Sequence, residues 1–334
     1  MVAQGKALVT GAAGFIGGHL AQRLLEQGWR VRLLVKNGQS LAAAVSQRCE
    51  LVTADLSVAA GVGEAVRGVD VIFHCAANVR TWDRWDAYQR DNVSAVANLL
   101  DAIARENRSL ARLVHFSSVD VYGFPLTPCD EEVRPDGGEF GYSRSKWQGE
   151  QLVAERCARD SIPCTILRPA NVFGPGGQFV SRIGEALASG LMLTVDGGRV
   201  NAGMTYIDNL LDYVLWAASA EAAVGRVYNV RDAYDLSWAE FVGRLRRGIN
   251  GRGRVLDLPF GIADRLARLC EGFYRVFLPS REPLLHRLLV HQFGRSCGHS
   301  AVRIRSDSGL VGRVGFDEAM ESSARSFLAA RAGR

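Results

Sequence analysis

The stretch from Lys6 to Gly28 constrains the fold more than any other part of this 334-residue chain. An apolar run at 7–9 leads into glycines at positions 11, 14 and 17, and a helical pattern then continues to Gly28. Glycines let backbone N–H groups approach a ligand, and the N-terminus of a helix attracts an anion. Although the spacing is G-x-x-G-x-x-G rather than G-x-G-x-x-G, the stretch predicts a pyrophosphate site. The alternative is a glycine-rich turn that binds nothing.

Apolar runs and helical patterns alternate after this loop. Four apolar runs between residues 29 and 116 are separated by segments of helical character, and the alternation predicts an α/β fold with a doubly wound parallel sheet of the Rossmann type. We expect residues 1–171, with a strand at 227–231, to form a dinucleotide-binding domain. We expect residues 172–226 and 232–330 to form a smaller, mostly helical substrate-binding region.

Residues at the ends of the predicted strands indicate the cofactor, because ligands bind beyond the carboxyl ends of parallel strands. Lys36 ends the second strand without an acidic neighbour in the sequence. Its cation suits the 2′-phosphate of NADP, so we expect NADP(H) to be favoured over NAD(H); the alternative is a solvated lysine. Asp55 is predicted to accept a hydrogen bond from the adenine amino group or to cap the next helix. Ala76 and Ala77 leave room for a cofactor to lie across the fourth strand.

Tyr142 and Lys146 are spaced for proton transfer. They stand four residues apart on a predicted helix, so they project from one face. We expect the ammonium group and a cationic nicotinamide to lower the phenol pKa from about 10 to about 7, which requires roughly 4 kcal/mol. Ser118 ends the adjacent predicted strand, where its hydroxyl would hydrogen-bond the substrate oxygen. Taken alone, a Tyr–Lys pair is also compatible with a solvated helix face.

The chain resembles the extended short-chain dehydrogenases/reductases of the NAD-dependent epimerase/dehydratase superfamily. The matching segments follow in order as TGAAGFIG, ADL at 54–56, HCAA at 74–77, FSSVDVYG at 116–123, YSRSK at 142–146 and RPANVFGPG at 168–176. The resemblance implies that Tyr142 is the catalytic acid/base, that Lys146 tunes it and binds the ribose, and that Ser118 orients the substrate. It also implies that Asn92 supports the lysine and a proton-relay water.

The expected cofactor contacts combine the glycine loop, the strand ends and the segment that the resemblance places beside the nicotinamide. They are Gly11, Gly14, Phe15, Ile16, Gly17, Lys36, Asp55, Leu56, Ala76, Ala77, Tyr142, Lys146, Pro169, Ala170, Asn171 and Val172.

The segment 78–85 indicates the branch of the superfamily. It lacks the Ser and Pro usual in sugar-nucleotide epimerases, and it contains Trp82 and Trp85, which is similar to the 3β-hydroxysteroid dehydrogenase-like branch. The alternative is that both tryptophans only pack the loop. The end of the chain departs from many relatives because it lacks their Gly-Tyr-x-Pro motif.

The resemblance therefore implies an NAD(P)-dependent oxidoreductase. The expected reaction interconverts a secondary alcohol and a ketone on a hydrophobic substrate, either sterol-like or a β-keto/β-hydroxy acyl compound. Two alternatives stay open: a nucleotide-sugar epimerase or dehydratase with tightly held NAD, and a non-catalytic cofactor-binding protein.

The range 260–295 contains a helix with an apolar stripe. Ile262, Leu266, Leu269 and Phe273 share one side of this helix, and arginines flank it. The favoured interpretation is a lid packed over the substrate cleft. The alternative is a basic amphipathic surface that makes peripheral membrane contact.

Composition narrows the remaining possibilities. The net charge of +5 is spread along the chain, so we expect no nucleic-acid binding. Seven cysteines form no CxxC pair, and no signal peptide or transmembrane run stands out, so we expect a cytoplasmic protein with reduced thiols. His74 has no partner ligands, so no metal site is expected. By analogy with relatives, helices at 91–106 and 142–159 would form a homodimer.

Overall fold

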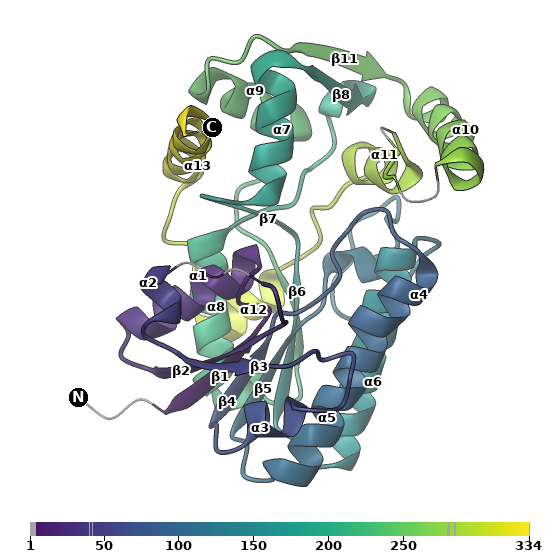
Figure 1. Ribbon diagram of the computed structural model, residues 1–334. Helices are drawn as coiled ribbons and strands as arrows, with labels where there is room; N and C mark the ends of the chain where they lie inside the picture. Colours follow the sequence, from purple (N-terminus) through teal and green to yellow (C-terminus); the bar gives the residue numbers. More distant parts are fainter. Residues whose placement is uncertain (1–4, 40, 42, 279–280, 284, 334) are drawn as a thin grey trace.

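The computed structural model describes residues 5–39, 41, 43–278, 281–283 and 285–333. Within these residues the centre is a seven-stranded sheet whose neighbouring strands are all parallel, in the order β10-β6-β5-β4-β1-β2-β3 (Figure 1). The strands are β1 (Lys6–Thr10), β2 (Arg30–Val35), β3 (Glu50–Thr53), β4 (Val71–His74), β5 (Arg112–Phe116), β6 (Cys164–Pro169) and β10 (Val227–Val230).

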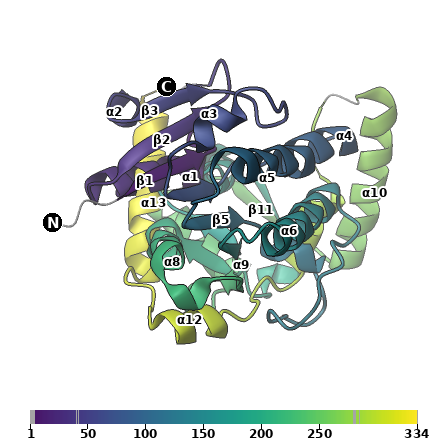
Figure 2. The same ribbon diagram turned by 90° about the horizontal axis from the view of Figure 1, so that it is seen from below.

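Helices cover both faces of this sheet, as Figure 2 shows from below. Alternate side chains of β1 explain why: Ala7 and Val9 join the cluster on one face, and Leu8 joins the cluster on the other. Strands buried on both faces read as continuous apolar runs. The first face holds α1 (Phe15–Glu26) and α8 (Ile207–Ser219), and the second holds α3 (Val62–Val66), α5 (Ala95–Glu106) and α6 (Gly141–Arg159). The predicted doubly wound parallel sheet is confirmed.

A smaller, mixed part lies above the carboxyl ends of the strands (Figure 1). Two short parallel pairs, β7 with β9 and β8 with β11, connect its helices. Its elements are β7 (Asn171–Phe173), α7 (Gln178–Ser189), β8 (Leu191–Val195), β9 (Met204–Tyr206), α9 (Trp238–Gly248), β11 (Arg254–Leu258), α10 (Phe260–Phe277), α11 (Arg287–Gly294) and α13 (Phe316–Ala332). The remaining helices are α2 (Ala43–Ser46), α4 (Trp85–Tyr88), η1 (Gln89–Ser94), η2 (Val119–Tyr122), η3 (Asp196–Gly198), η4 (Glu221–Ala223) and α12 (Val302–Ser308).

The chain passes more than once between the sheet and the upper part. It leaves after β6, returns with α8, which packs on β5 and β6, and adds β10 beside β6 before it leaves again. Helix α8 therefore covers the sheet, although the range 172–226 was predicted to belong to the substrate-binding region. Its buried residues, Leu210, Leu211 and Val214 among them, form part of the core cluster under the sheet. The rest of the proposed domain division stays a prediction.

Two further findings concern helices. The predicted helix 91–106 is part of a longer helical stretch, α4-η1-α5, whose middle segment Gln89–Ser94 is a π-helix. Within the described residues, no helix is long and apolar enough to cross a membrane.

Candidate active site

The glycine loop between β1 and α1 has the tight backbone that its spacing predicts. Gly11 has φ +69°, and a Cβ there would lie 2.7 Å from the backbone nitrogen of Ala76. A Cβ on Gly17 would overlap the carbonyl oxygen of Gly11. Gly14 is the N-cap of α1 and donates its N–H to Gly11 O at 2.9 Å, and no side chain caps this helix. The uncapped N-terminus of α1 fits an anionic pyrophosphate.

The loop is fastened to the end of β4. Thr10 Oγ1 lies 2.9 Å from His74 Nδ1 and accepts a hydrogen bond from the Ala76 backbone N–H at 3.2 Å. The small residues Ala76 and Ala77 therefore stand directly beside the glycine loop, as a cofactor lying across the sheet would require.

Lys36 differs from the sequence-based expectation. The prediction took it as a cation without an acidic neighbour, but its Nζ lies 2.7 Å from a carboxylate oxygen of Asp55. The two residues meet because β2 and β3 are adjacent parallel strands, with Val35 paired to Thr53. Burial alone would raise the pKa of Asp55, but hydrogen bonds from Lys36 and Ser57 lower it to about 2.

Asp55 does not cap the next helix, α3, whose N-cap is Gly61, and its predicted bond to the adenine amino group stays a prediction. Its Oδ1 accepts hydrogen bonds from both the backbone N–H and the hydroxyl of Ser57, at 2.9 and 2.7 Å. The carboxylate thus forms a turn with its own following residues and an ion pair with Lys36. At the carboxyl edge of the sheet, one oxygen of this carboxylate is bonded to Ser57 and the other to Lys36.

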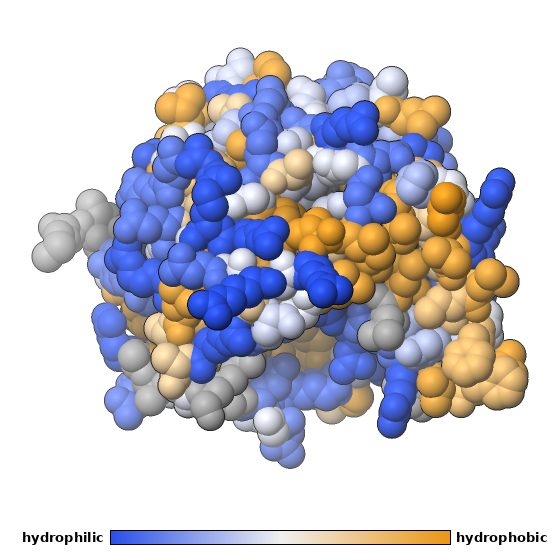
Figure 3. Space-filling view, turned by 90° about the horizontal axis from the view of Figure 1, so that it is seen from above, coloured by the Kyte–Doolittle hydropathy of each residue, from blue (hydrophilic) through white to orange (hydrophobic). Residues whose placement is uncertain are grey.

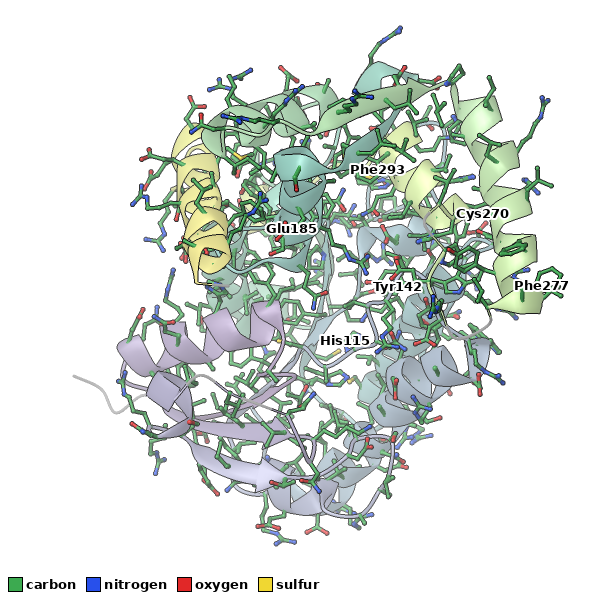
Figure 4. The ribbon with its side chains drawn as sticks, turned by 45° about the horizontal axis from the view of Figure 1, so that its top comes forward. His115, Tyr142, Glu185, Cys270, Phe277 and Phe293 are labelled. Carbon is green, nitrogen blue, oxygen red and sulfur yellow. The ribbon has the colours of Figure 1, made fainter. Side chains whose placement is uncertain are left out.

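Ser118 and Tyr142 meet at the carboxyl edge of the sheet. Ser118 is the N-cap of η2, directly after β5, and its side chain hydrogen-bonds Tyr142 at the start of α6. Figure 4 shows Tyr142 in the middle of the molecule, between His115 of the sheet and Phe293 of α11. This pair is the predicted pair of hydroxyl groups that a substrate oxygen would contact.

The pKa of Tyr142 differs in direction from the expectation. Burial and the charge of Asp120 raise it above its usual value, and the hydrogen bond from Ser118 only partly offsets this increase. Lys146 was predicted to lower the pKa, but its Nζ donates to the carbonyl oxygen of Phe116 at 2.5 Å. Burial lowers the pKa of Lys146 to about 8, against the opposing charges of Glu150 and Cys75. The phenol is therefore protonated at neutral pH in this arrangement.

A buried ion pair holds the wall behind Lys146. Glu150 lies one turn further along α6, and Arg168 of β6 donates to it at 2.5 Å; both side chains are at most 4% exposed. Ser117 donates to the same carboxylate at 2.6 Å, and Arg168 also donates to the hydroxyl of Tyr122 at 2.7 Å. Helix α6 and strands β5 and β6 are thereby fixed to one another next to the reacting groups.

Asn92 holds the backbone around the site, and its predicted support of Lys146 and a relay water stays a prediction. Its Oδ1 accepts from the Asn78 backbone N–H at 2.7 Å, and its Nδ2 donates to Asn78 O and to Ser145 Oγ at 3.0 and 2.9 Å. Ser145 in turn donates to the carbonyl oxygen of Tyr142 at 2.8 Å. Asn92, in the π-helical segment, therefore positions the loop after β4 and the first turn of α6.

The segment after β6 lies at the same edge. Asn171 donates to the carbonyl oxygen of Ala202 at 2.6 Å and accepts from Gln292 at 2.7 Å. These contacts tie the predicted nicotinamide-side segment, Pro169 to Val172, to the upper part of the molecule.

Asp120 is a site residue that the motif reading missed. Its backbone N–H donates to Ser118 Oγ at 3.1 Å, and its charge acts on both Tyr142 and Cys297. Burial raises its pKa to about 7. In the part of the chain that the structure describes, its carboxyl group has no hydrogen bond or ion pair. The sequence could have pointed to it, because an acidic residue stands within FSSVDVYG, two residues after Ser118.

A cavity of about 880 Å³ opens beside this site. One wall is the loop and helix from Arg80 to Tyr88, and Gly141 next to Tyr142 lies at its base. The opposite wall belongs to α10 and the segment that follows it. Trp82 lines the cavity beneath the guanidinium of Arg275, 5.4 Å from the ring centre.

Thr81 and Glu282 join the two walls by a hydrogen bond of 2.9 Å. The guanidinium of Arg281 faces this cavity without an ion-pair partner among the described residues. Both tryptophans of the segment 78–85 line the cavity as well. The cavity therefore combines aromatic rings with charged side chains of both signs, among which Arg281 has no paired acid within the described residues.

Comparisons with known proteins identify the family and several relatives of this chain. Residues 7–230 match the model of the NAD dependent epimerase/dehydratase family. The chain is 30% identical over 327 residues to the 2-alkyl-3-oxoalkanoate reductase of Stenotrophomonas maltophilia, covering 94% of this chain and 97% of that protein. It is 28% identical to the 4-hydroxy-2-methyl-3-oxo-4-farnesyl-3,4-dihydroquinoline-1-oxide ketoreductase of Stigmatella aurantiaca, covering 95% of each.

The fold is shared with solved structures. The structure of MoeE5 in complex with UDP-glucuronic acid and NAD superposes with a TM-score of 0.79, at 23% identity, and covers 98% of this chain and 100% of that one.

Proposed function

Because the chain belongs to the NAD dependent epimerase/dehydratase family and is an NAD(P)-dependent oxidoreductase, we propose that it reduces the ketone of a hydrophobic β-keto acyl substrate. The observation that carries this proposal is the hydrogen-bonded pair of Ser118 and Tyr142, together with a cavity lined by Gly141, the residue before Tyr142. The reverse reaction, oxidation of the β-hydroxy compound, uses the same groups.

The chemistry follows from the residues present. When bound, the nicotinamide supplies hydride to the carbonyl carbon. The Oη of Tyr142 donates a proton to the substrate oxygen, and the hydroxyl of Ser118 hydrogen-bonds that oxygen. Burial favours this role because it keeps the phenol protonated at neutral pH. Lys146 lies one turn after Tyr142 on α6, and because its pKa is about 8 it is the group that we propose returns a proton to Tyr142.

The cavity supports a substrate with a carboxylate and an apolar chain. Trp82, Tyr88 and Phe140 give it aromatic surface, and Arg281 gives it a cation. One relative is a reductase of 2-alkyl-3-oxoalkanoates, which are molecules of this kind. A sterol would use the aromatic wall but leave the arginine without a partner.

Replacing the phenol tests the proposal. Tyr142→Phe should abolish reduction of a 2-alkyl-3-oxoalkanoate, because the donated proton is lost, while the affinity for NADPH stays within about threefold. Cofactor oxidation at 340 nm and a fluorescence titration measure the two effects. Tyr274→Phe removes a phenol on α10 that does not line the cavity and should leave both unchanged. Full turnover by Tyr142→Phe would discard the mechanism.

We also propose that NADPH is favoured over NADH. The support is Lys36, whose side chain is 53% exposed although it is paired with Asp55, so that a 2′-phosphate can compete for it. Lys36→Ala should weaken NADPH binding about fivefold, as expected for an exposed ion pair, and leave NADH binding unchanged. Lys6→Ala, which removes a lysine at the start of β1, away from the carboxyl ends of the strands, is the control. Equal loss for both cofactors would contradict the preference.

The alternative function, a nucleotide-sugar epimerase, predicts a different cofactor content for the purified protein. It would return the hydride to its substrate, so the purified protein would carry a nicotinamide cofactor and need none added. Release of NAD on denaturation, together with turnover of a UDP-sugar and none of a β-keto acid, would replace the reductase proposal with this one.

A further inference from the structure

Helix α10 buries its small side chains and exposes its large ones. Ala263 and Ala267 are at most 1% exposed and pack with Val290 of α11. The outward side chains are large and apolar, and Leu269 and Val276 are 73% and 71% exposed. The outer face consists of Ile262, Leu266, Leu269, Phe273, Val276 and Phe277. An ordinary surface helix of a globular protein does the reverse.

This outer face lies on the surface of the molecule. Figure 3 shows apolar side chains gathered on the right-hand side, where Figure 1 places α10. The lid interpretation of the stripe at 260–273 is therefore wrong for these residues, because they point away from the cleft. Of the range 260–295, residues 279, 280 and 284 lie outside the described residues.

The charges of α10 are sorted by side. Its two acids turn inward: Asp264 and Glu271 are 14% and 12% exposed at their side chains and are engaged by arginines. Arg268 and Arg275 remain 58% and 68% exposed in these pairs. Arg265 is exposed, with no ion-pair partner in the described part of the chain. The outer face thus presents apolar side chains with Arg265 and Arg268 beside them, and its own acids are withdrawn, whereas Arg275 lies over Trp82 on the cavity side.

We propose that the outer face of α10 rests on an anionic phospholipid bilayer, with the helix lying in the plane of the interface. Phenylalanine, leucine and valine side chains would enter the acyl boundary, and the arginines would contact the phosphates. A second copy of the chain fits less well. Two such faces packed against each other would bring arginines together without exposed acids on α10 to pair with them.

This placement would also bring the cavity near the lipid surface, because α10 forms one of its walls. Glu271 and Arg275 of α10 line the cavity, as does Arg281 just after the helix. A hydrophobic substrate dissolved in the bilayer would enter without crossing water; this part rests on the proposed function, whereas the lipid contact does not.

Vesicle sedimentation with the full chain tests the contact. Wild-type protein should pellet with vesicles of phosphatidylcholine and phosphatidylglycerol, less with phosphatidylcholine alone, and less at high salt. The double substitution Leu269→Glu and Phe273→Glu should lower the partition coefficient at least tenfold. Arg265→Gln should lower it about fivefold on the anionic vesicles only.

Leu328→Glu is the matched control, because Leu328 is 40% exposed on another surface helix, α13. Its binding should equal that of the wild type. Circular dichroism and turnover of a water-soluble short-chain ketone should be the same in all four proteins, which separates this proposal from the proposed function.

Three outcomes would overturn the lipid contact. They are wild-type protein that pellets with no vesicle, equal pelleting of the double variant, and a lipid-free dimer in sedimentation velocity that only the double variant dissociates.

Discussion

Asp120 and Tyr142 lie close enough for the charge of the carboxylate to shift the pKa of the phenol. Asp120 has a pKa of about 7, so it is largely charged above that pH and favours the protonated phenol. Proton donation in the reductive direction benefits from this charge, while proton removal in the oxidative direction is opposed by it. The charge of Asp120 can therefore influence the pH dependence of both reduction and oxidation.

Asp120→Asn should consequently move the oxidative pH profile. Oxidation needs the phenolate, whose fraction rises with pH below the pKa of Tyr142. Without the carboxylate this pKa falls, so the same oxidative rate should be reached about one pH unit lower. Asp101→Asn, an exposed acid on α5, should not move it. The measurement is kcat/KM for the alcohol between pH 6 and 10. A profile that stays in place would remove Asp120 from this role.

For single residues, the sequence predicted those positions that depend only on local secondary structure. Tyr142 and Lys146 are one turn apart on a helix, and Ser118 follows a strand, so their positions follow from local structure. Lys36 and Asp55 are far apart in the sequence and meet only because β2 and β3 are neighbours. The partners of the Asn92 amide, Asn78 and Ser145, were unpredictable for a similar reason, since tertiary packing brings them together.

Among the elements, the start of α1 has little freedom to change. Gly17→Ala should displace the glycine loop, because the added Cβ overlaps the Gly11 carbonyl oxygen. We expect NADPH affinity to fall at least tenfold, measured by fluorescence titration, with a lower melting temperature. Gly243→Ala on α9 is the control: its Cβ would meet only the end of the Arg247 side chain, at 3.7 Å, and helix propensity should make it neutral or stabilising by up to about 1 kcal/mol. Unaltered cofactor affinity in Gly17→Ala would mean that the loop does not hold the pyrophosphate.

Helix α10 illustrates a limit of hydrophobic periodicity, which identifies the apolar side of a helix without giving its orientation in the fold. The spacing of Ile262, Leu266, Leu269 and Phe273 correctly predicts one apolar side of a helix. It does not say which side faces the protein, and here the alanine side packs against α11. The π-helical segment Gln89–Ser94 was also unpredictable, because its side chains carry no local signal that separates it from an α-helix.

For the whole molecule, two buried histidines link stability to pH. His74 and His115 stack in neighbouring strands with ring centres 5.3 Å apart, and neither ring nitrogen of His115 has a hydrogen-bond partner among the described residues. Burial lowers the pKa of His74 to about 3 and the pKa of His115 well below its usual value. In the unfolded chain both would titrate near 6.5.

The unfolded state therefore binds more protons below about pH 6.5, and stability should fall as the pH drops from there. Each histidine contributes up to about 1.4 kcal/mol per pH unit. His115→Phe should reduce the loss of melting temperature between pH 7 and pH 5, while His19→Gln, at a half-buried histidine of α1 that lies 3.0 Å from the carbonyl oxygen of Pro175, should not. Thermal unfolding at the two pH values measures this. The same slope in His115→Phe and wild type would exclude His115 as a contributor.

The repeated passage of the chain between the sheet and the upper part limits how this enzyme could be cut or recombined. A recombinant fragment that stops near residue 170 would lose α8 and β10 together, stripping one face of the sheet and turning β6 into a bare edge. Exchange of the substrate-binding half with that of a relative must therefore swap several separate segments at once, since a single crossover point would leave neither parent's core intact.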